Sequence, residues 1–170
     1  MLELCSSSLE DTHAIAGSLA GLSRAGDIIV LSGEMGAGKT AFAQGFGSAL
    51  GVSEPITSPT YTLVHSYDIN RDAPAGNGPQ SVTLHHADLY RLNSTTEVAE
   101  LALEELAEYR GIVLVEWGDV VESLFGEHLV VHLEPDVDRE EARTIDLSAA
   151  GQSWAARWGR LTDATREFAC

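Results

Sequence analysis

The sequence predicts one α/β domain, in which helices flank a mixed, mainly parallel central sheet and a hairpin closes the C-terminal part. Short apolar runs at residues 27–32 and 111–117 are typical of strands that are buried on both faces of a parallel sheet. Helix-compatible segments alternate with these runs, which is the pattern of an α/β fold. A chain of 170 residues, 44% of them hydrophobic, can form one core of ordinary size. We therefore expect a single domain over residues 1–170.

The N-terminal segments predict a strand, a helix, a second strand, a loop and a second helix, in that order. Residues 2–5 can form an edge strand. Ser7 and Glu10 have the spacing of a capping box, and they precede a helix-periodic stretch that Gly26 ends. The helix after the loop is expected at residues 41–50.

The rest of the chain predicts two antiparallel strand pairs, an acidic helix and a C-terminal helix. Turn-forming residues and alternating apolar positions mark their limits. The elements expected in order are strands at 61–67 and 81–86 joined by a surface loop at 68–80, a helix at 95–109, a buried strand at 111–117, a hairpin of strands at 128–134 and 143–147, and a helix at 153–168.

Residues 33–40 match the phosphate-binding pattern of Gly, four residues, then Gly-Lys-Thr, between a predicted strand and a predicted helix. The glycines let the backbone N–H groups converge on phosphate oxygens, and the helix adds its positive N-terminal end. Lys39, the only lysine among ten basic residues, would reach the β- and γ-phosphates, and the hydroxyl of Thr40 would hold Mg²⁺. The residues expected to contact nucleotide here are Gly33, Glu34, Met35, Gly36, Ala37, Gly38, Lys39, Thr40 and Ala41.

A magnesium site beside such a loop needs a carboxylate from the end of a neighbouring strand. Glu116 is the better candidate, because the four apolar residues before it predict a buried strand that delivers it to the ligand edge of the sheet. Asp88 ends a shorter and more polar strand, and it could equally cap a helix that begins at Leu89. Trp117 could stack on the nucleotide or fill the core.

Hydroxyl groups are concentrated after residue 56, where NTPases with a switch keep a loop that senses the γ-phosphate. Threonine is common in strands, so this segment is weak support by itself. His85 and His86 are adjacent in a predicted strand and face opposite sides, which favours packing or surface roles over a shared metal. The residues of the switch candidate are Ser58, Pro59, Thr60, Tyr61 and Thr62.

The net charge of −16 disfavours direct, high-affinity binding of nucleic acid and makes a basic partner protein a better match. No apolar stretch is long enough to span a bilayer, and the N-terminus lacks the basic start and apolar core of a signal peptide. Cys5 and Cys170 lie at opposite ends of the chain without zinc-site spacing. We therefore expect free thiols in a cytoplasmic protein with no membrane segment.

Four blocks together resemble the TsaE (YjeE) family, the bacterial P-loop ATPases needed to form threonylcarbamoyladenosine in tRNA. They are Gly-Glu-Met-Gly-Ala-Gly-Lys-Thr at 33–40, Ser-Pro-Thr-Tyr-Thr-Leu-Val at 58–64, His-Ala-Asp-Leu-Tyr-Arg-Leu at 86–92 and Val-Glu-Trp at 115–117. Their order and spacing are similar to the family's over about residues 7–147. One phosphate-binding loop is shared by many families, whereas these four blocks together are specific.

The resemblance implies that Thr40 and Glu116 are the magnesium ligands and that Asp88, with Glu116 and Lys39, is catalytic. It implies that residues 58–64 are the first switch and that Trp117 lies near the nucleotide. The cofactors implied are ATP or ADP and Mg²⁺. The partners implied are TsaD, which transfers the threonylcarbamoyl group, and TsaB, its scaffold.

The family also contacts nucleotide from the start of the first helix and from an arginine in the last hairpin, for which Leu9 and Arg139 are the nearest matches. Loop 68–80 is longer than expected of the family, and the tail at 151–170 has no dependable match. We therefore expect an ATP-binding, slowly hydrolysing subunit of the tRNA-modifying assembly.

Other classes remain open at this point. A small-metabolite or nucleotide kinase also has a P-loop, but it usually needs several lid arginines, and here the arginines are scattered except for Arg139 and Arg143. A nucleotide-gated binding module would differ only in whether turnover matters. A regulatory GTPase is disfavoured, because its guanine-reading motif Asn-Lys-x-Asp needs a second lysine.

Overall fold

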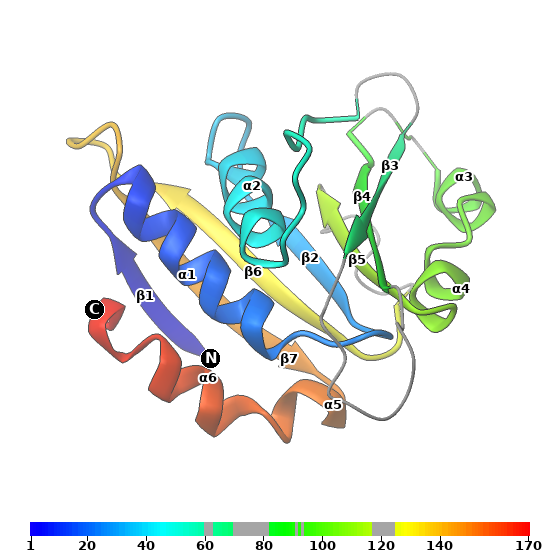
Figure 1. Ribbon diagram of the computed structural model, residues 1–170. Helices are drawn as coiled ribbons and strands as arrows, with labels where there is room; N and C mark the ends of the chain where they lie inside the picture. The colour runs from blue at the N-terminus through cyan, green and yellow to red at the C-terminus, as the bar shows by residue number, and fades with distance from the viewer. Residues whose placement is uncertain (60–62, 70–81, 91, 93, 117–124) are drawn as a thin grey trace.

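The computed structural model describes residues 1–59, 63–69, 82–90, 92, 94–116 and 125–170. Its seven strands form one mixed sheet in the order β1-β7-β6-β2-β5-β4-β3 (Figure 1). Strands β6, β2, β5 and β4 run parallel to one another, whereas the pairs β1–β7, β7–β6 and β4–β3 are antiparallel. The strands are β1 (Leu2–Ser6), β2 (Ile28–Ser32), β3 (Val64–Ile69), β4 (Val82–Asp88), β5 (Gly111–Glu116), β6 (His128–Pro135) and β7 (Arg143–Ala150).

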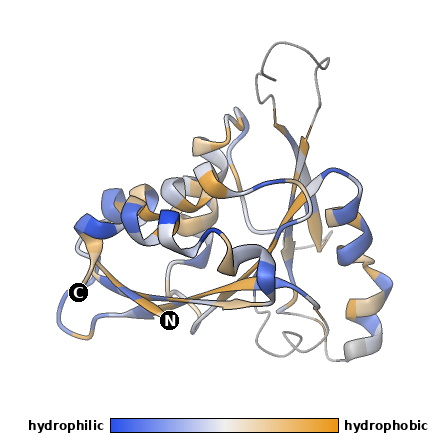
Figure 2. Ribbon diagram, turned by 90° about the horizontal axis from the view of Figure 1, so that it is seen from below, coloured by the Kyte–Doolittle hydropathy of each residue, from blue (hydrophilic) through white to orange (hydrophobic). Residues whose placement is uncertain are grey.

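The mixed sheet, the strand pair β3–β4 and the C-terminal hairpin β6–β7 confirm the predicted α/β class. Successive residues of β2 and β5 alternate between two apolar clusters, because neighbouring side chains of a strand point to opposite faces. Helices α1 and α2 cover one face of the sheet. Helices α3 and α4 contribute to the apolar cluster on the opposite face, towards the end of the sheet formed by β5, β4 and β3 (Figure 2). The helices are α1 (Leu9–Leu22), α2 (Lys39–Ala49), α3 (Thr95–Glu100), α4 (Leu103–Glu108), α5 (Gln152–Ala155) and α6 (Trp158–Ala164).

The predicted capping box at the start of α1 is shifted by one residue. The N-cap is Ser8, whose hydroxyl accepts a hydrogen bond from the backbone N–H of Asp11. The Asp11 carboxylate in turn accepts from the N–H of Ser7 at 2.8 Å. Asp11 therefore does what the sequence assigned to Glu10, which is exposed.

The single acidic helix predicted at 95–109 is wrong, because α3 and α4 are separated at Ala102, whose φ is 50°. In one continuous helix, Val98 and Leu103 would point about 140° apart, at 100° per residue. The break lets both side chains enter the same apolar cluster. Burial of these two residues thus outweighs the cost of a left-handed alanine.

The predicted C-terminal helix is likewise divided, into α5, α6 and a 3₁₀ turn (Arg166–Phe168). Arg157 lies between α5 and α6, and its guanidinium makes two 2.7 Å hydrogen bonds to the carboxylate of Asp27, just before β2. Both residues are buried. Trp154 and Leu161 enter the main core from the same tail, so these helices are an integral part of the fold.

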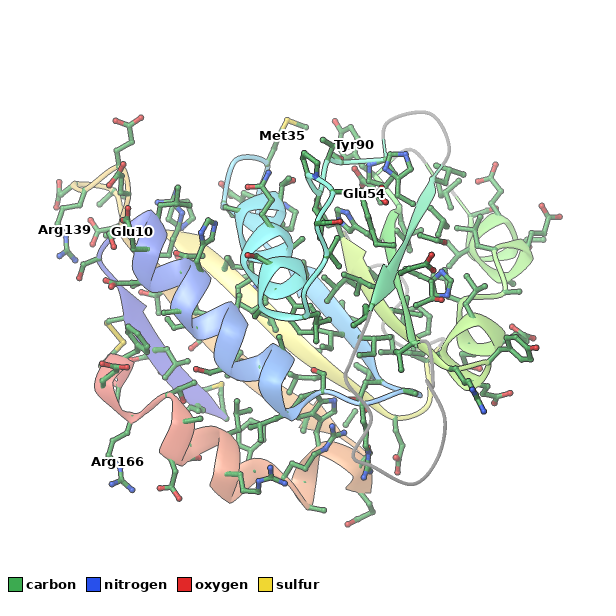
Figure 3. All side chains as sticks on the ribbon, in the orientation of Figure 1. Glu10, Met35, Glu54, Tyr90, Arg139 and Arg166 are labelled. Carbon is green, nitrogen blue, oxygen red and sulfur yellow. A yellow bond between two sulfur atoms is a disulfide. The ribbon has the colours of Figure 1, made fainter. Side chains whose placement is uncertain are left out.

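Charged side chains such as Glu10, Arg139 and Arg166 project outward from the surface (Figure 3). Among the helices that the structure describes, none has the length and apolar character needed to cross a membrane.

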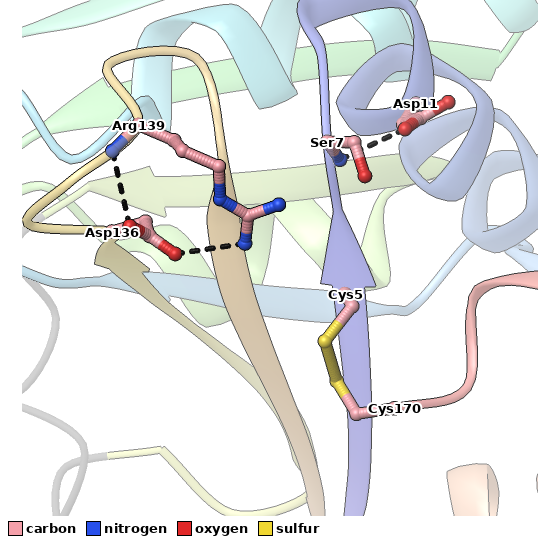
Figure 4. The surroundings of a disulfide bond; sticks show 6 residues. All are labelled: Cys5, Ser7, Asp11, Asp136, Arg139 and Cys170. Carbon is pink, nitrogen blue, oxygen red and sulfur yellow. Dashed lines mark hydrogen bonds and ion pairs between the residues drawn. A yellow bond between two sulfur atoms is a disulfide. The ribbon is translucent and has the colours of Figure 1, made fainter.

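The expected free thiols are a further correction, because Cys5 and Cys170 form a disulfide (Figure 4). The tail runs back along the edge strand β1, where Leu4 and Ala169 form an isolated bridge. The two cysteines are 165 residues apart in the sequence, so no local pattern indicated that they meet. In the fold their Cα atoms are 5.2 Å from each other. The two cysteines therefore do not support the reducing compartment that was expected from them.

The disulfide spans 165 residues, so it restricts the unfolded chain strongly. We predict that reduction lowers the free energy of unfolding by about 2–4 kcal/mol. Calorimetry with and without dithiothreitol should show a midpoint that is lower by roughly 4–16 °C in the reductant. The variant Cys170→Ser should melt like the reduced protein under both conditions. Equal midpoints for the oxidised and reduced wild type would contradict the prediction.

Candidate nucleotide-binding site

The loop between β2 and α2 has the backbone that its glycines were predicted to allow. Gly33, Gly36 and Gly38 have φ values of 130°, 82° and 106°, in the region that favours glycine. A Cβ on Gly33 would lie 2.3 Å from the carbonyl oxygen of Leu133, so no other residue fits there without a shift. The strand, loop and helix therefore have the geometry of a phosphate-binding nest.

Lys39 begins α2 and is buried, with 5% of its surface exposed. Its Nζ donates hydrogen bonds of 2.8 Å to the carbonyl oxygens of Gly33 and Glu34. The ammonium group thus lies against the loop itself. Phosphate oxygens, which carry full negative charge, would be stronger acceptors than these two carbonyls.

Two carboxylates lie beside the loop because of the parallel strand register. Asp88 and Glu116 end β4 and β5 as direct register partners, and Glu116 is also paired with Leu31 of β2. The strand ends therefore meet at the edge where the loop begins, as predicted. The hydroxyl of Thr40 donates to Oε1 of Glu116 at 3.3 Å.

The contact between Thr40 and Glu116 suits a small divalent cation. Adjacent ligands of an octahedral Mg²⁺ are about 3.0 Å apart, given metal–oxygen distances of about 2.1 Å. The 3.3 Å between these two oxygens is close to that value. Mg²⁺ usually takes one or two protein groups and completes its shell with phosphates and water, so the pair is a sufficient donor set. The described residues contain no group of three or more His, Cys, Asp or Glu side chains that could hold a metal without a nucleotide.

Asp88 is not a helix cap, which settles the alternative left open by the sequence. The helix that follows it begins only at Thr95, with Ser94 as its N-cap. One oxygen of Asp88 accepts from the backbone N–H of Tyr90 at 3.1 Å, and the other accepts from the hydroxyl of Ser58 at 2.7 Å. The carboxylate is therefore held in place and is in contact with the start of the predicted switch.

The pocket in front of the loop has a volume of about 320 Å³. Met35 and Tyr90 lie at its rim, 68% and 55% exposed (Figure 3). Pro59 of the predicted switch follows Ser58 and is buried. Four further predicted residues lie outside the described part of the chain, namely Thr60, Tyr61, Thr62 and Trp117. The pocket is lined by Met35, Gly36, Gly38, Lys39, Thr40, Ala41, Ser58, Asp88, Tyr90 and Glu116.

A second pocket, of about 220 Å³, adjoins the first, because Gly38 and Ala41 line both. Leu9, the predicted contact from the first helix, forms part of its wall. The remaining lining residues come from α1 and the β6–β7 hairpin and are Thr12, Glu140, Glu141 and Arg143.

The two arginines of the β6–β7 hairpin have different surroundings. Arg139, the predicted nucleotide contact, is exposed in the turn and pairs with Asp136 at 2.9 Å. This hydrogen bond holds the pKa of Asp136 below its usual value. Arg143 begins β7, and its Nε donates to the carbonyl oxygen of Ala37 in the loop at 2.8 Å. The sequence contains one sign that could have pointed to Arg143 as the arginine beside the loop. Arg143 begins a predicted strand, which fixes its position, whereas Arg139 lies in the turn.

His86 is the residue at this site that the sequence analysis assigned to packing. It is fully buried in β4, two residues before Asp88 and therefore on the same face, and its Nε2 lies 2.8 Å from Oε1 of Glu116. His85 points the other way and contacts the hydroxyl of Ser66. Burial lowers the pKa of His85, as expected for a packed histidine.

Known proteins of one family are similar to this chain over most of its length. A sequence profile of the family described as Threonylcarbamoyl adenosine biosynthesis protein TsaE matches residues 6–145. The chain is 34% identical over 146 residues to the tRNA threonylcarbamoyladenosine biosynthesis protein TsaE of Bacillus subtilis, covering 85% of this chain and 84% of that protein. It is 35% identical over 140 residues to the protein of the same name from Streptomyces coelicolor, covering 81% and 89%.

A solved structure, described as Bacillus subtilis YdiB, matches with a TM-score of 0.73 and 28% identity, covering 95% of this chain and 94% of the other. The profile match includes every site residue from Leu9 to Arg143 and ends before α5 and α6. The chain therefore belongs to the TsaE family of threonylcarbamoyladenosine biosynthesis proteins.

Proposed function

We propose that the protein binds ATP and ADP with Mg²⁺ and slowly hydrolyses ATP within the assembly that forms threonylcarbamoyladenosine in tRNA. The observation that carries this proposal is the contact of Thr40 with Glu116 directly beside a glycine loop that holds Lys39. Loop, cation donors and ammonium group converge on one pocket. The cytoplasmic location predicted from the sequence is part of this proposal.

The chain's own groups suggest how each part of the nucleotide is handled. The loop N–H groups and Lys39 would bind the phosphates, and Thr40 and Glu116 would hold Mg²⁺, which neutralises charge on the β- and γ-phosphates. Asp88 lies beside Glu116 but takes no part in the hydrogen bond between Glu116 and Thr40. Its carboxylate would therefore be available to orient the attacking water. Ser58 would report on the γ-phosphate through its hydrogen bond to Asp88.

We place the adenine base in the second pocket. It adjoins the phosphate loop at Gly38 and Ala41, and it has apolar surface from Leu9. Glu140 and Glu141 line it and offer carboxylate oxygens to the exocyclic amino group of adenine, which guanine lacks at that position. This arrangement favours ATP over GTP, in agreement with the missing guanine motif.

The family resemblance names TsaD and TsaB as the partners. A net charge of −16 supports contacts with basic partner surfaces rather than with tRNA directly. The kinase alternative is weaker, because Arg143 is the one arginine that lines either pocket among the described residues. A nucleotide-gated module without turnover remains the second candidate, favoured by the lack of an arginine aimed at the first pocket in the described part of the chain.

The phosphate assignment predicts that Lys39→Ala lowers ADP affinity by about a hundredfold or more, because a charge-assisted contact to phosphate is lost. Lys39→Arg should also fail, since the planar guanidinium does not fit a site built for a compact ammonium group. Calorimetric titration measures the affinity, and the melting temperature of each variant controls for folding. Unchanged ADP affinity in a folded Lys39→Ala protein would rule out the assignment.

The two hairpin arginines provide a matched pair for the base pocket. Arg143→Ala should weaken ADP binding by about tenfold or more, because it removes a charged donor from the loop and one wall of the pocket. Arg139→Ala should leave the affinity within a factor of about two, as is usual for exposed ion pairs. The same titration decides between them. If Arg139→Ala lowers the ADP affinity more than Arg143→Ala does, Arg139 is the nucleotide contact instead.

The assembly role predicts that TsaB and TsaD together raise the ATPase rate. Among the described residues that line the first pocket there is no arginine that could act as an arginine finger, and such a group can contribute about 10³–10⁵ in rate. Asp88→Asn and Glu116→Gln should lose the stimulated rate, with Glu116→Gln also losing metal affinity. Steady-state ATPase assays against partner concentration test this. A rate that does not change with the partners would favour the kinase alternative, which an assay with small hydroxylated acceptors would then examine.

A further inference from the structure

His86 is a buried polar residue for which packing alone gives no reason. It has no exposed surface, and the parallel register places it on the same face of the sheet as Asp88, Leu114 and Glu116. Leu84, two residues earlier on that face, enters the main apolar core. An apolar side chain at position 86 would continue that core.

The hydrogen bonds of His86 are incomplete. Its Nε2 lies 2.8 Å from Oε1 of Glu116, and an ionised carboxylate can only accept, so the proton is on Nε2. Its Nδ1 is buried and has no hydrogen-bond partner among the described residues. A buried nitrogen without a partner opposes folding, so stability does not account for a histidine here. Among the described residues, the hydrogen bond that the His86 side chain does make is the one it donates to Glu116.

Glu116 needs such a donor. It is buried, with 3% of its surface exposed, and within the described part of the chain its carboxylate has hydrogen bonds with Thr40 and His86. The longer contact, 3.3 Å to Thr40, comes from the hydroxyl that would itself be engaged by a cation. His86 then remains as the donor that fixes the rotamer of the carboxylate.

We propose that His86 is a positioning residue for the metal site, and that its Nε2–H orients Glu116 to bind Mg²⁺. This inference rests on the proposed nucleotide-binding function and adds to it the group that prepares the metal ligand. Hydrogen bonds to ligating carboxylates keep a ligand in its binding geometry, and their loss commonly reduces metal affinity by about 10–100-fold.

His85 supplies a matched control. It is the neighbouring histidine of β4, is 8% exposed, and contacts Ser66 on the opposite face rather than Glu116. Replacement of either histidine disturbs the same strand. Only replacement of His86 removes a hydrogen bond from the metal ligand.

The test measures metal binding directly, with Mn²⁺ as the probe in place of Mg²⁺. Each protein is saturated with a non-hydrolysable ATP analogue and titrated with Mn²⁺, and free Mn²⁺ is followed by electron paramagnetic resonance. His86→Leu should weaken Mn²⁺ binding by about 10–100-fold. His86→Gln, whose amide nitrogen can occupy the position of Nε2, should recover most of the affinity, and His86→Asn, whose amide is too short, should not. His85→Leu should bind Mn²⁺ like the wild type.

ADP affinity in the presence of a chelator supplies the second measurement. It should be the same in every variant, since the phosphate loop is intact. Equal Mn²⁺ affinity in wild type and His86→Leu would overturn the inference, and so would equal losses in His86→Gln and His86→Asn. If His86→Leu does not fold, the Gln and Asn pair decides alone. A third outcome concerns the wild type alone. If its nucleotide complex binds Mn²⁺ no more tightly than free nucleotide does, the magnesium assignment itself is wrong, and the inference about His86 fails with it.

Discussion

The site depends on the parallel register of three neighbouring strands, β4, β5 and β2. This pairing sets Asp88 beside Glu116 and Glu116 beside the strand that enters the glycine loop. A shift of one residue in β5 would turn Glu116 to the opposite face, towards the cluster around α3 and α4. Such a shift is prevented by burial, because every residue of β2 and β5 is buried and each face has its own apolar partners.

The same register concentrates opposing charges in a small volume. Lys39 and Arg143 both donate hydrogen bonds to carbonyl groups of the loop, while Asp88 and Glu116 lie at the ends of the strands. On a chain with a net charge of −16, two carboxylates beside a phosphate site would repel an anionic ligand. A divalent cation between Glu116 and the phosphates would remove this repulsion. The geometry therefore supports the proposed magnesium requirement, which the loop and the lysine alone would not explain.

Local sequence patterns were sufficient to predict those parts of the fold whose structure depends on neighbouring residues in the chain. The loop at 33–40, the buried strands and the carboxylates at their ends could be predicted, because strand period and glycine content carry that information. The break at Ala102 and the pairing of Cys5 with Cys170 depend on distant packing, which no window of sequence contains. The role of His86 was missed for a related reason. Its contact with Glu116 exists only once β4 and β5 are paired.

The C-terminal tail is best understood as a support for β2. It lies beyond the part of the chain that the family profile matches, yet Arg157 reaches Asp27 at the start of that strand. At the other end, Ser32 is hydrogen-bonded to His132 at 2.9 Å, immediately before the loop. Loss of either Arg157 or Asp27 would leave the other charge buried and unpaired, at a cost of about 3–5 kcal/mol, so the tail has to remain docked at the start of β2. A strand anchored at both ends can hold the glycine loop in its curled backbone before any ligand binds.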